Sequence, residues 1–217
     1  MRTDKRIIDP RIPRFPKKIE EKLTELGNQF KTAGWIKEAT ELGNALNLVP
    51  MIKNGKLRGT TNVAPLNEYI EEFPYTLGPL EELFAAAEGY FLVSIFDLDK
   101  GYFQVPLHEN SQKYFHTRWP GHGINAWTVM VQGDKTAPGK FQLEMDLMIR
   151  RINSSKKLSP DSVIIARLDD IAVFTKKMSI EAHSNDVRIL IEEFIKYGWK
   201  GNQTKIKLFR TKVAWLG

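Results

Sequence analysis

The sequence predicts an α+β fold, in which an antiparallel sheet carries helices on one face and a smaller lobe precedes it. From residue 90 onward, apolar strand-length runs alternate with two helical stretches at 137–152 and 180–197. Most of these strands come as pairs joined by turn residues, which is typical of antiparallel neighbours. An Asn-Gly pair at 54–55 marks a separate hairpin within the first 88 residues. We therefore expect two lobes of unequal size.

The smaller lobe follows a basic, proline-broken arm at residues 1–15 and covers residues 16–88. It begins with a helix at 17–33, because apolar residues recur at spacings of three and four between Ile19 and Phe30. The other elements expected here are strands at 46–52 and 56–63, a loop at 64–76 and a short helix at 77–87.

The larger lobe covers residues 89–217 and carries the expected sheet. Its first strand, 90–97, is almost continuously apolar, as in a strand that is covered on its face. Pro138 suits the first turn of one long helix, and Gly198 suits the residue that follows the other. The remaining expected strands are 114–119, 124–131, 163–166, 171–174, 206–209 and 213–216.

Composition narrows the class of protein. The 217 residues carry a formal net charge of +6, which favours polyanionic partners and nucleic acid first. The sequence has no cysteine, which excludes disulfides and thiolate metal sites, and its four histidines lack the spacing of metal ligands. We find no signal peptide and no apolar run long enough to span a membrane. The expectation is an intracellular protein with no membrane partner.

The chemistry of the chain centres on the stretch DSVIIARLDDIAVFTKK at residues 161–177. Two apolar runs flank Asp169 and Asp170, so these adjacent carboxylates are expected at a tight hairpin turn. Asp97 closes the apolar strand at 90–97, where a carboxylate needs a partner. If these strands are neighbours, the three carboxylates meet and suit a hard cation such as Mg²⁺. The alternative from these residues alone is a solvated turn and an exposed strand end.

Five stretches resemble motifs of the reverse transcriptases of retroviruses and Gypsy-type LTR retrotransposons, in the same order and at similar spacing. The stretch FDLDKGYFQVPLHENSQKYFHTR resembles their first catalytic motif, and QGDKTAPGKFQ resembles the second. RLDDIAVFTKK is similar to the YxDD hairpin, and GWKGNQTKIKLFRTKVAWLG resembles the end of the palm. Upstream, LVPMIKNGKLRGTTNVAPLN resembles the fingers hairpin. Together these stretches extend the resemblance over nearly the whole chain.

The resemblance implies a right-hand polymerase core without a thumb. The palm would be a ferredoxin-like antiparallel sheet at 89–217, and the fingers subdomain would cover 16–88 with a further strand pair near 114–131. The implied reaction is RNA-directed DNA synthesis, in which a primer 3′-hydroxyl attacks the α-phosphate of a dNTP. The implied partners are an RNA or DNA template with its primer, dNTPs, and the thumb and RNase H parts of a polyprotein. The implied location is the cytoplasm or a virus-like particle.

The resemblance also implies the metal ligands. The carboxylates of Asp97, Asp169 and Asp170 would bind two Mg²⁺ ions, with Mn²⁺ as an alternative. The main-chain carbonyl of Leu98 would be a further ligand. In this interpretation the two ions neutralise charge at the reacting phosphate.

The nucleotide and primer contacts follow from the same motifs. Lys53 and Arg58 would hold the incoming triphosphate, since Arg can bind phosphate in a bidentate manner. Tyr102 would exclude a 2′-hydroxyl, and Gln132 would touch the sugar-phosphate of the nucleotide. The primer grip would consist of Trp215, Leu216 and Gly217.

Departures from the family pattern keep other interpretations open. Arg167 stands where the hairpin motif has Tyr, and strand alternation places it on the same side as Asp169. Asn62 and Ala64 replace an Asp and an Arg of the fingers pattern. These changes favour a catalytically silent or domesticated module that binds nucleic acid. A third interpretation is an RNA-binding domain unrelated to polymerases, which would not need three carboxylates.

Overall fold

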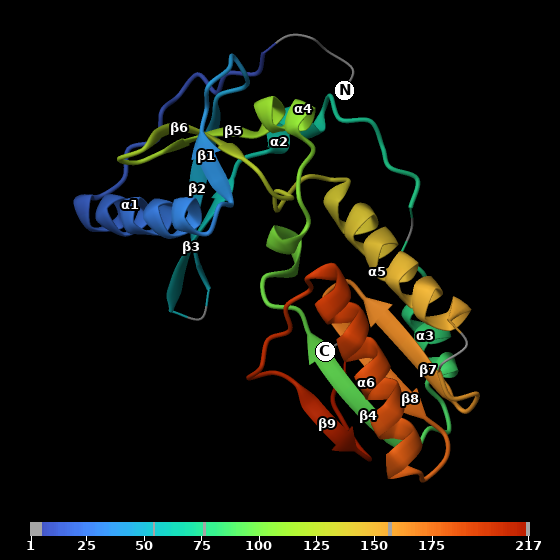
Figure 1. Cartoon of the computed structure of the whole chain (residues 1–217). Helices are drawn as coiled ribbons and strands as arrows, with labels where there is room; N and C mark the ends of the chain where they lie inside the picture. Colours follow the sequence, from blue (N-terminus) through green and yellow to red (C-terminus); the bar gives the residue numbers. More distant parts are fainter. Residues whose placement is uncertain (1–5, 54, 76, 156–157, 216–217) are drawn as a thin grey trace. The chain divides into compact units, whose positions relative to one another are not determined.

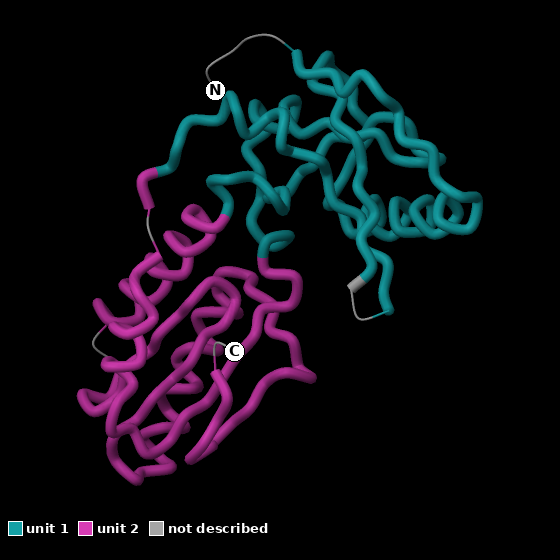
Figure 2. Tube along the Cα trace, turned by 180° about the vertical axis from the view of Figure 1, so that it is seen from behind, with its two compact units in different colours: residues 1–73, 102–137 teal, residues 74–101, 138–217 magenta. Residues whose placement is uncertain are grey.

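The computed structural model describes residues 6–53, 55–75, 77–155 and 158–215 (Figure 1). Contacts divide the chain into two compact units, each built from two segments of sequence (Figure 2). Unit 1 comprises Met1–Phe73 and Tyr102–Ala137, and unit 2 comprises Pro74–Gly101 and Pro138–Gly217. The first division thus falls after residue 73 rather than at 88, because the helix expected at 77–87 packs against the second unit.

Unit 1 is a five-stranded sheet packed against one long helix, α1 (Lys17–Thr32). The strand order is β1-β6-β5-β2-β3, and neighbours are antiparallel except for the parallel pair β2 and β5. The sequence analysis did not predict the short strand β1. It also did not predict the helix α2, which lies inside the expected loop at 64–76. The bounds are β1 Ile36–Glu38, β2 Leu46–Lys53, β3 Lys56–Thr61, β5 His116–Trp119, β6 Gly123–Trp127, α2 Ala64–Asn67 and α4 Glu109–Gln112, with 3-10 turns at Gly101–Gln104 and Lys113–Phe115.

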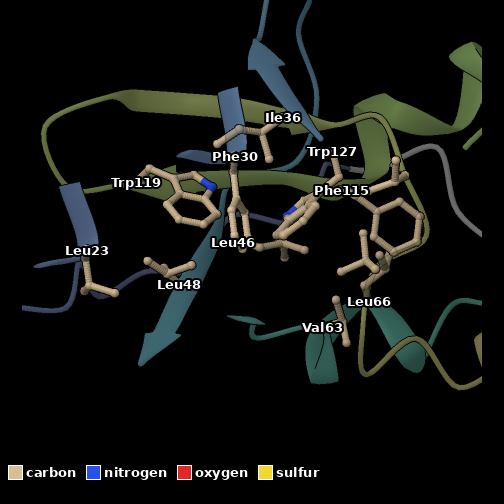
Figure 3. Close-up of a cluster of buried hydrophobic side chains, with 12 residues drawn as sticks. Leu23, Phe30, Ile36, Leu46, Leu48, Val63, Leu66, Phe115, Trp119 and Trp127 are labelled. Carbon is tan, nitrogen blue, oxygen red and sulfur yellow. The ribbon is translucent and has the colours of Figure 1, made fainter. Parts of the chain in front are cut away.

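Aromatic rings and aliphatic side chains together form the core of unit 1 (Figure 3). Phe30 of α1 packs edge-on against Trp119 and Trp127 of the sheet, with ring centroids 5.5 and 5.7 Å apart. The buried Trp127 indole donates to Thr61 Oγ1 at 2.8 Å, so its N–H is satisfied inside the core. The helix predicted from periodicity therefore buries the face that its spacing defines.

Unit 2 is built on an antiparallel sheet of order β7-β8-β4-β9. This agrees with the expected antiparallel sheet. The tail supplies only one strand, because residues 213–215 have no regular structure and residue 216 lies outside the described residues. The bounds are β4 Leu92–Asp97, β7 Ser162–Arg167, β8 Asp170–Thr175, β9 Lys207–Arg210, α3 Leu80–Ala86, α5 Ala137–Ser154 and α6 Ile180–Tyr197.

The two long helices lie together on one face of this sheet, as expected (Figure 1). Arg151 of α5 pairs with Glu193 of α6 at 2.8 Å, and Phe96 of β4 meets Phe194 of α6. The opposite face is also apolar, because β4 is buried along almost its whole length. There Val93 and Phe174 lie in a cluster that includes Leu83 from the region of α3 and Trp215 from the tail.

A buried histidine links α6 to the sheet and makes the stability of unit 2 depend on pH. His183 is fully buried, with Ser94 Oγ 2.7 Å from Nε2 and Thr175 Oγ1 2.8 Å from Nδ1. Burial lowers the pKa of His183, and the nearby carboxylate of Asp186 opposes this only partly. The unfolded chain therefore binds a proton at a pH where the folded chain does not.

We expect the free energy of unfolding to fall as the pH drops below about 6.5, the ordinary pKa of histidine. For one proton the slope is at most about 1.4 kcal/mol per pH unit. Urea unfolding between pH 7.5 and 5.5 measures it, and His183→Gln should flatten the profile. Since burial also lowers the pKa of His116 in unit 1, His116→Gln is the matched variant for the other unit. Equal slopes in His183→Gln and the unmodified chain would contradict the prediction.

Candidate active site

The β7–β8 hairpin fixes two of the three predicted carboxylates. β7 ends at Arg167, β8 begins at Asp170, and these two residues are paired across the hairpin. Between them lies a two-residue turn in which Leu168 has a φ of 54°, in the left-handed region. Asp169 is therefore in the turn itself, and Asp170 is the first residue of the returning strand.

The third carboxylate lies on the neighbouring strand. Asp97 ends β4 and is the cross-strand partner of Asp170, so the two side chains share one face of the sheet. The Leu98 amide donates to the carbonyl of Asp169 at 3.0 Å, which joins the end of β4 to the turn. Burial, and then the charges of Asp169 and Asp97, raise the pKa of Asp170. The structure thus brings the three predicted acids into one electrostatic cluster.

A lysine that the sequence analysis did not identify is part of this cluster. Lys205 Nζ lies 2.7 Å from Asp97 Oδ2, in a pair whose carboxylate side chain is only 14% exposed. The pKa of Lys205 is raised, chiefly by its hydrogen bond to Asp97 and further by the charges of Asp169 and Asp170. A turn anchors Lys205 there, because the Asn202 amide donates to the Asp97 carbonyl at 2.7 Å and the Lys205 amide donates to Asn202.

The donor chemistry of the cluster suits a divalent metal, since carboxylate oxygens are the ligands that Mg²⁺ and Mn²⁺ prefer. Burial is the largest cause of the raised pKa of Asp170, and the repulsion from Asp169 and Asp97 that adds to it is what a cation relieves. In the part of the chain that the structure describes, however, no three such side chains are arranged ready to hold a metal ion. An ammonium group, that of Lys205, neutralises Asp97 in this arrangement.

A glutamine of α5 holds the backbone of the β7–β8 turn. Gln142 is buried, donates from Nε2 to the Ala166 carbonyl at 3.0 Å and accepts from the Leu168 amide at 2.8 Å. The same Nε2 donates to Asp146 Oδ1 at 2.8 Å. Gln142 belongs to the QGDKTAPGKFQ stretch, but no local pattern in the sequence indicates that it reaches the turn.

Gly101 allows the chain to approach the turn closely. A Cβ at this position would lie 2.9 Å from Phe141 Cζ and 3.3 Å from Asp169 Cβ. The first distance is shorter than real contacts permit, so only glycine fits without displacing the ring beside Asp169. This close approach gives a physical reason for the glycine within the DLDKGY stretch.

The four predicted nucleotide contacts all belong to unit 1, whereas the carboxylates belong to unit 2. Lys53 ends β2 opposite Lys56, and Arg58 is exposed on β3. Tyr102 is half-buried in the 3-10 turn after Gly101, and Gln132 is exposed. Their roles remain predictions.

Unit 1 holds the loop at residues 132–135 through contacts that the sequence analysis missed. The carbonyl of Gln132 accepts from Thr60 Oγ1 of β3 at 3.4 Å. Asn67 of α2 donates from its side chain to the Gly133 carbonyl at 2.9 Å and accepts from the Lys135 amide at 3.1 Å. The second motif-like stretch and the hairpin of unit 1 are therefore connected directly.

Trp215 and Arg167 take positions that periodicity did not reveal. The Trp215 ring packs on Phe174, with centroids 5.3 Å apart, and its Nε1 is buried without a hydrogen-bond partner among the described residues. Leu216 and Gly217 lie outside the described residues.

Arg167 lies opposite Asp170 and donates from Nη1 to the Gly78 carbonyl. The prediction that Arg167 and Asp169 point to the same side was wrong. It assumed strand alternation, but β7 ends at Arg167 and Asp169 lies in the turn that follows.

A family model described as reverse transcriptase (RNA-dependent DNA polymerase) matches residues 53–217. The chain belongs to this family. It is 31% identical over 166 residues to the enzymatic polyprotein of soybean chlorotic mottle virus, covering 76% of this chain and 23% of the relative. It is 25% identical over 194 residues to the transposon Tf2-3 polyprotein of Schizosaccharomyces pombe, covering 88% of this chain and 14% of the relative. The chain thus spans a quarter or less of either polyprotein.

A solved structure supports the fold independently. The chain resembles the foamy viral protease-reverse transcriptase in complex with double-stranded DNA, with a TM-score of 0.81 at 18% identity. The likeness covers 95% of this chain and 34% of that one. The fold is therefore that of a retroviral polymerase core, as the sequence resemblance implied. Separately, none of the helices in the described ranges is long and apolar enough to cross a membrane.

Proposed function

We propose that the chain is the polymerase core of an RNA-directed DNA polymerase, which adds dNTPs to a primer 3′-hydroxyl. The observation that carries the proposal is the cross-strand pairing of Asp97 with Asp170 beside the turn that holds Asp169. Membership of the reverse transcriptase family supports it. Three acids placed so close together have no evident structural use, because burial and their mutual repulsion disfavour the charge of Asp170 and raise its pKa.

In this proposal Asp97, Asp169 and Asp170, with the carbonyl of Leu98, hold two Mg²⁺ or Mn²⁺ ions. Such ions supply charge neutralisation at the attacking and leaving oxygens of an in-line displacement. Lys205 donates to Asp97 Oδ2, so it has to release that oxygen before a metal can use it. The side chain of Lys205 is 59% exposed, so water can replace Asp97 as the partner of its ammonium group.

The remaining contacts are proposed from the motifs. Lys53 and Arg58 flank the tip of the β2–β3 hairpin, where their charges suit a triphosphate. Gln132 touches the sugar-phosphate, and the segment with Trp215, Leu216 and Gly217 contributes to primer binding. The proposed partners are a primed RNA or DNA template and the other parts of a polyprotein, and the proposed location is the cytoplasm or a virus-like particle. Binding to duplex is further supported by the foamy viral relative, whose structure contains double-stranded DNA.

A primer-extension assay tests the proposal. The chain is incubated with a primed RNA template, dNTPs and Mg²⁺ or Mn²⁺, with EDTA as the control. Extension that requires the metal supports the proposal, and primer–template binding without extension under either metal contradicts it. Binding should weaken steeply with salt, since the attraction is chiefly to phosphates.

A ribonucleotide experiment tests Tyr102. If its ring lies under the sugar, Tyr102→Ala should admit ribonucleotides, because the aromatic ring excludes a 2′-hydroxyl by steric clash. We expect the preference for dNTP over rNTP to fall by at least about tenfold, the effect of ~1.4 kcal/mol. Steady-state extension with each nucleotide measures it. Tyr102→Phe keeps the ring and should keep the preference, and an unchanged preference in Tyr102→Ala would remove Tyr102 from the site.

A catalytically silent module that binds nucleic acid is the second candidate function. Two observations favour it: Asp97 is already neutralised by Lys205, and Arg167 replaces the tyrosine of the hairpin motif. The extension assay separates the two candidates, because a silent module would bind the primer–template equally well in EDTA and in Mg²⁺ and extend nothing.

A further inference from the structure

Arg167 ties the β7–β8 hairpin to the chain ahead of α3. Its guanidinium Nη1 donates to the carbonyl of Gly78, two residues before α3 begins. Arg167 is the last residue of β7, immediately before the turn that carries Asp169. The residue that departs from the family pattern is thus held within unit 2 by a backbone acceptor.

A second connection reaches the same turn from the same region of sequence. The phenol of Tyr75 donates to Asp146 Oδ2 on α5, and Asp146 Oδ1 accepts from Gln142 Nε2. Gln142 in turn donates to the Ala166 carbonyl and accepts from the Leu168 amide. The hydrogen bond to Asp146 is the largest cause of the raised pKa of Tyr75, because this bond stabilises the protonated phenol.

We propose that Arg167 and the Tyr75–Asp146–Gln142 chain are a pair of anchors that position the β7–β8 turn, and with it Asp169 and Asp170. One anchor acts on the residue before the turn, and the other acts on the turn backbone through Leu168. Both anchors start within four residues of each other, at Tyr75 and Gly78. The role of Arg167 in this chain is to position the turn from inside unit 2. The effect of the anchors on catalysis rests on the proposed function, whereas their effect on the position of the turn does not.

The geometry explains why two anchors are needed. Leu168 has a positive φ, which a non-glycine residue adopts only when its surroundings hold it there. Asp170, the first residue after the turn, carries a carboxylate that Asp169 and Asp97 repel, which favours opening of the hairpin end. Gln142 opposes both effects, because it binds the Ala166 carbonyl before the turn and the Leu168 amide within the turn.

Amide hydrogen exchange at Leu168 tests the anchors without any assay of activity. Arg167→Met and Tyr75→Phe should each speed exchange of this amide about three- to tenfold, the worth of one hydrogen bond, while the Val173 amide in the middle of β8 keeps its rate. Gln142→Met removes the acceptor of the Leu168 amide itself, so it sets the upper limit for the increase in the exchange rate. Arg188→Met and Tyr197→Phe remove the same groups from exposed positions of α6 and should leave Leu168 unchanged.

Rescue separates anchoring from general destabilisation. Arg167→Lys keeps a donor of similar reach and should restore slow exchange in part. With primer and template, the anchor variants should lower kcat while leaving the KM for dNTP nearly unchanged, because only the carboxylates are displaced. Unchanged exchange at Leu168 in both Arg167→Met and Tyr75→Phe overturns the inference, even if the chain is an active polymerase. Faster exchange in a chain that extends no primer upholds the anchors and overturns the proposed function.

Discussion

Asp97→Asn and Asp170→Asn should each lower the rate of primer extension by at least about 10³-fold, through loss of several kcal/mol of charge stabilisation. Each substitution keeps the size of the side chain and removes one carboxylate from the cluster at the ends of β4 and β8. The readout is single-turnover extension in Mg²⁺. Asp99→Asn is the matched control, because it makes the same change at an exposed residue of the same segment.

The folded state should tolerate these substitutions. The raised pKa of Asp170 means that the fold disfavours its charge, so Asp170→Asn should leave the metal-free chain at least as stable at pH 7. Asp97→Asn also removes the partner of Lys205, but that pair is partly exposed and contributes little. Parallel loss of extension and of thermal stability would show that the acids are structural and would refute the assignment.

Trp215→Ala should destabilise unit 2 by about 2–4 kcal/mol, since it removes a large ring from an apolar cluster. The ring contacts Phe174 of the sheet and Phe84 of α3, with centroids 5.3 and 6.3 Å away. Urea unfolding measures the change. Ile195→Ala on the exposed side of α6 is the control and should cost less than ~0.5 kcal/mol.

A conservative variant distinguishes packing from hydrogen bonding at this position. Trp215→Phe retains an aromatic ring and removes an indole N–H that has no partner among the described residues. Its cost should therefore be well below that of Trp215→Ala. If Trp215→Ala left stability intact but weakened primer binding, the packing role would be refuted in favour of the primer grip.

Local signals in the sequence predicted the elements that local physics determines. The Asn-Gly pair and the apolar runs around Asp169 predicted two hairpins, because turn chemistry and strand period act over a few residues. Gly198, with a φ of 76°, ends α6 where a left-handed residue was expected. The helix bounds agree closely for the same reason.

Residues brought in from distant sequence could not be predicted. Lys205 reaches Asp97 across 108 positions, and nothing near either residue encodes that contact. Gln142 was part of a quoted motif, yet its link to Leu168 depends on how α5 packs against β7. The three-residue strand β1 was missed because its pairing with β6, rather than its own pattern, makes it a strand.

The chain crosses between the units three times, after residues 73, 101 and 137, and these crossings determine an order of assembly during synthesis. All of unit 1 has been translated once residue 137 has emerged, whereas β4 of unit 2 must wait for β8 and β9, encoded some 80 and 115 residues later. Until then the run LVSIF of β4, which is buried in the finished fold, has no partner strand. Such an unpaired apolar strand is prone to aggregate, so the nascent chain is most in need of a chaperone between the completion of unit 1 and the arrival of β8.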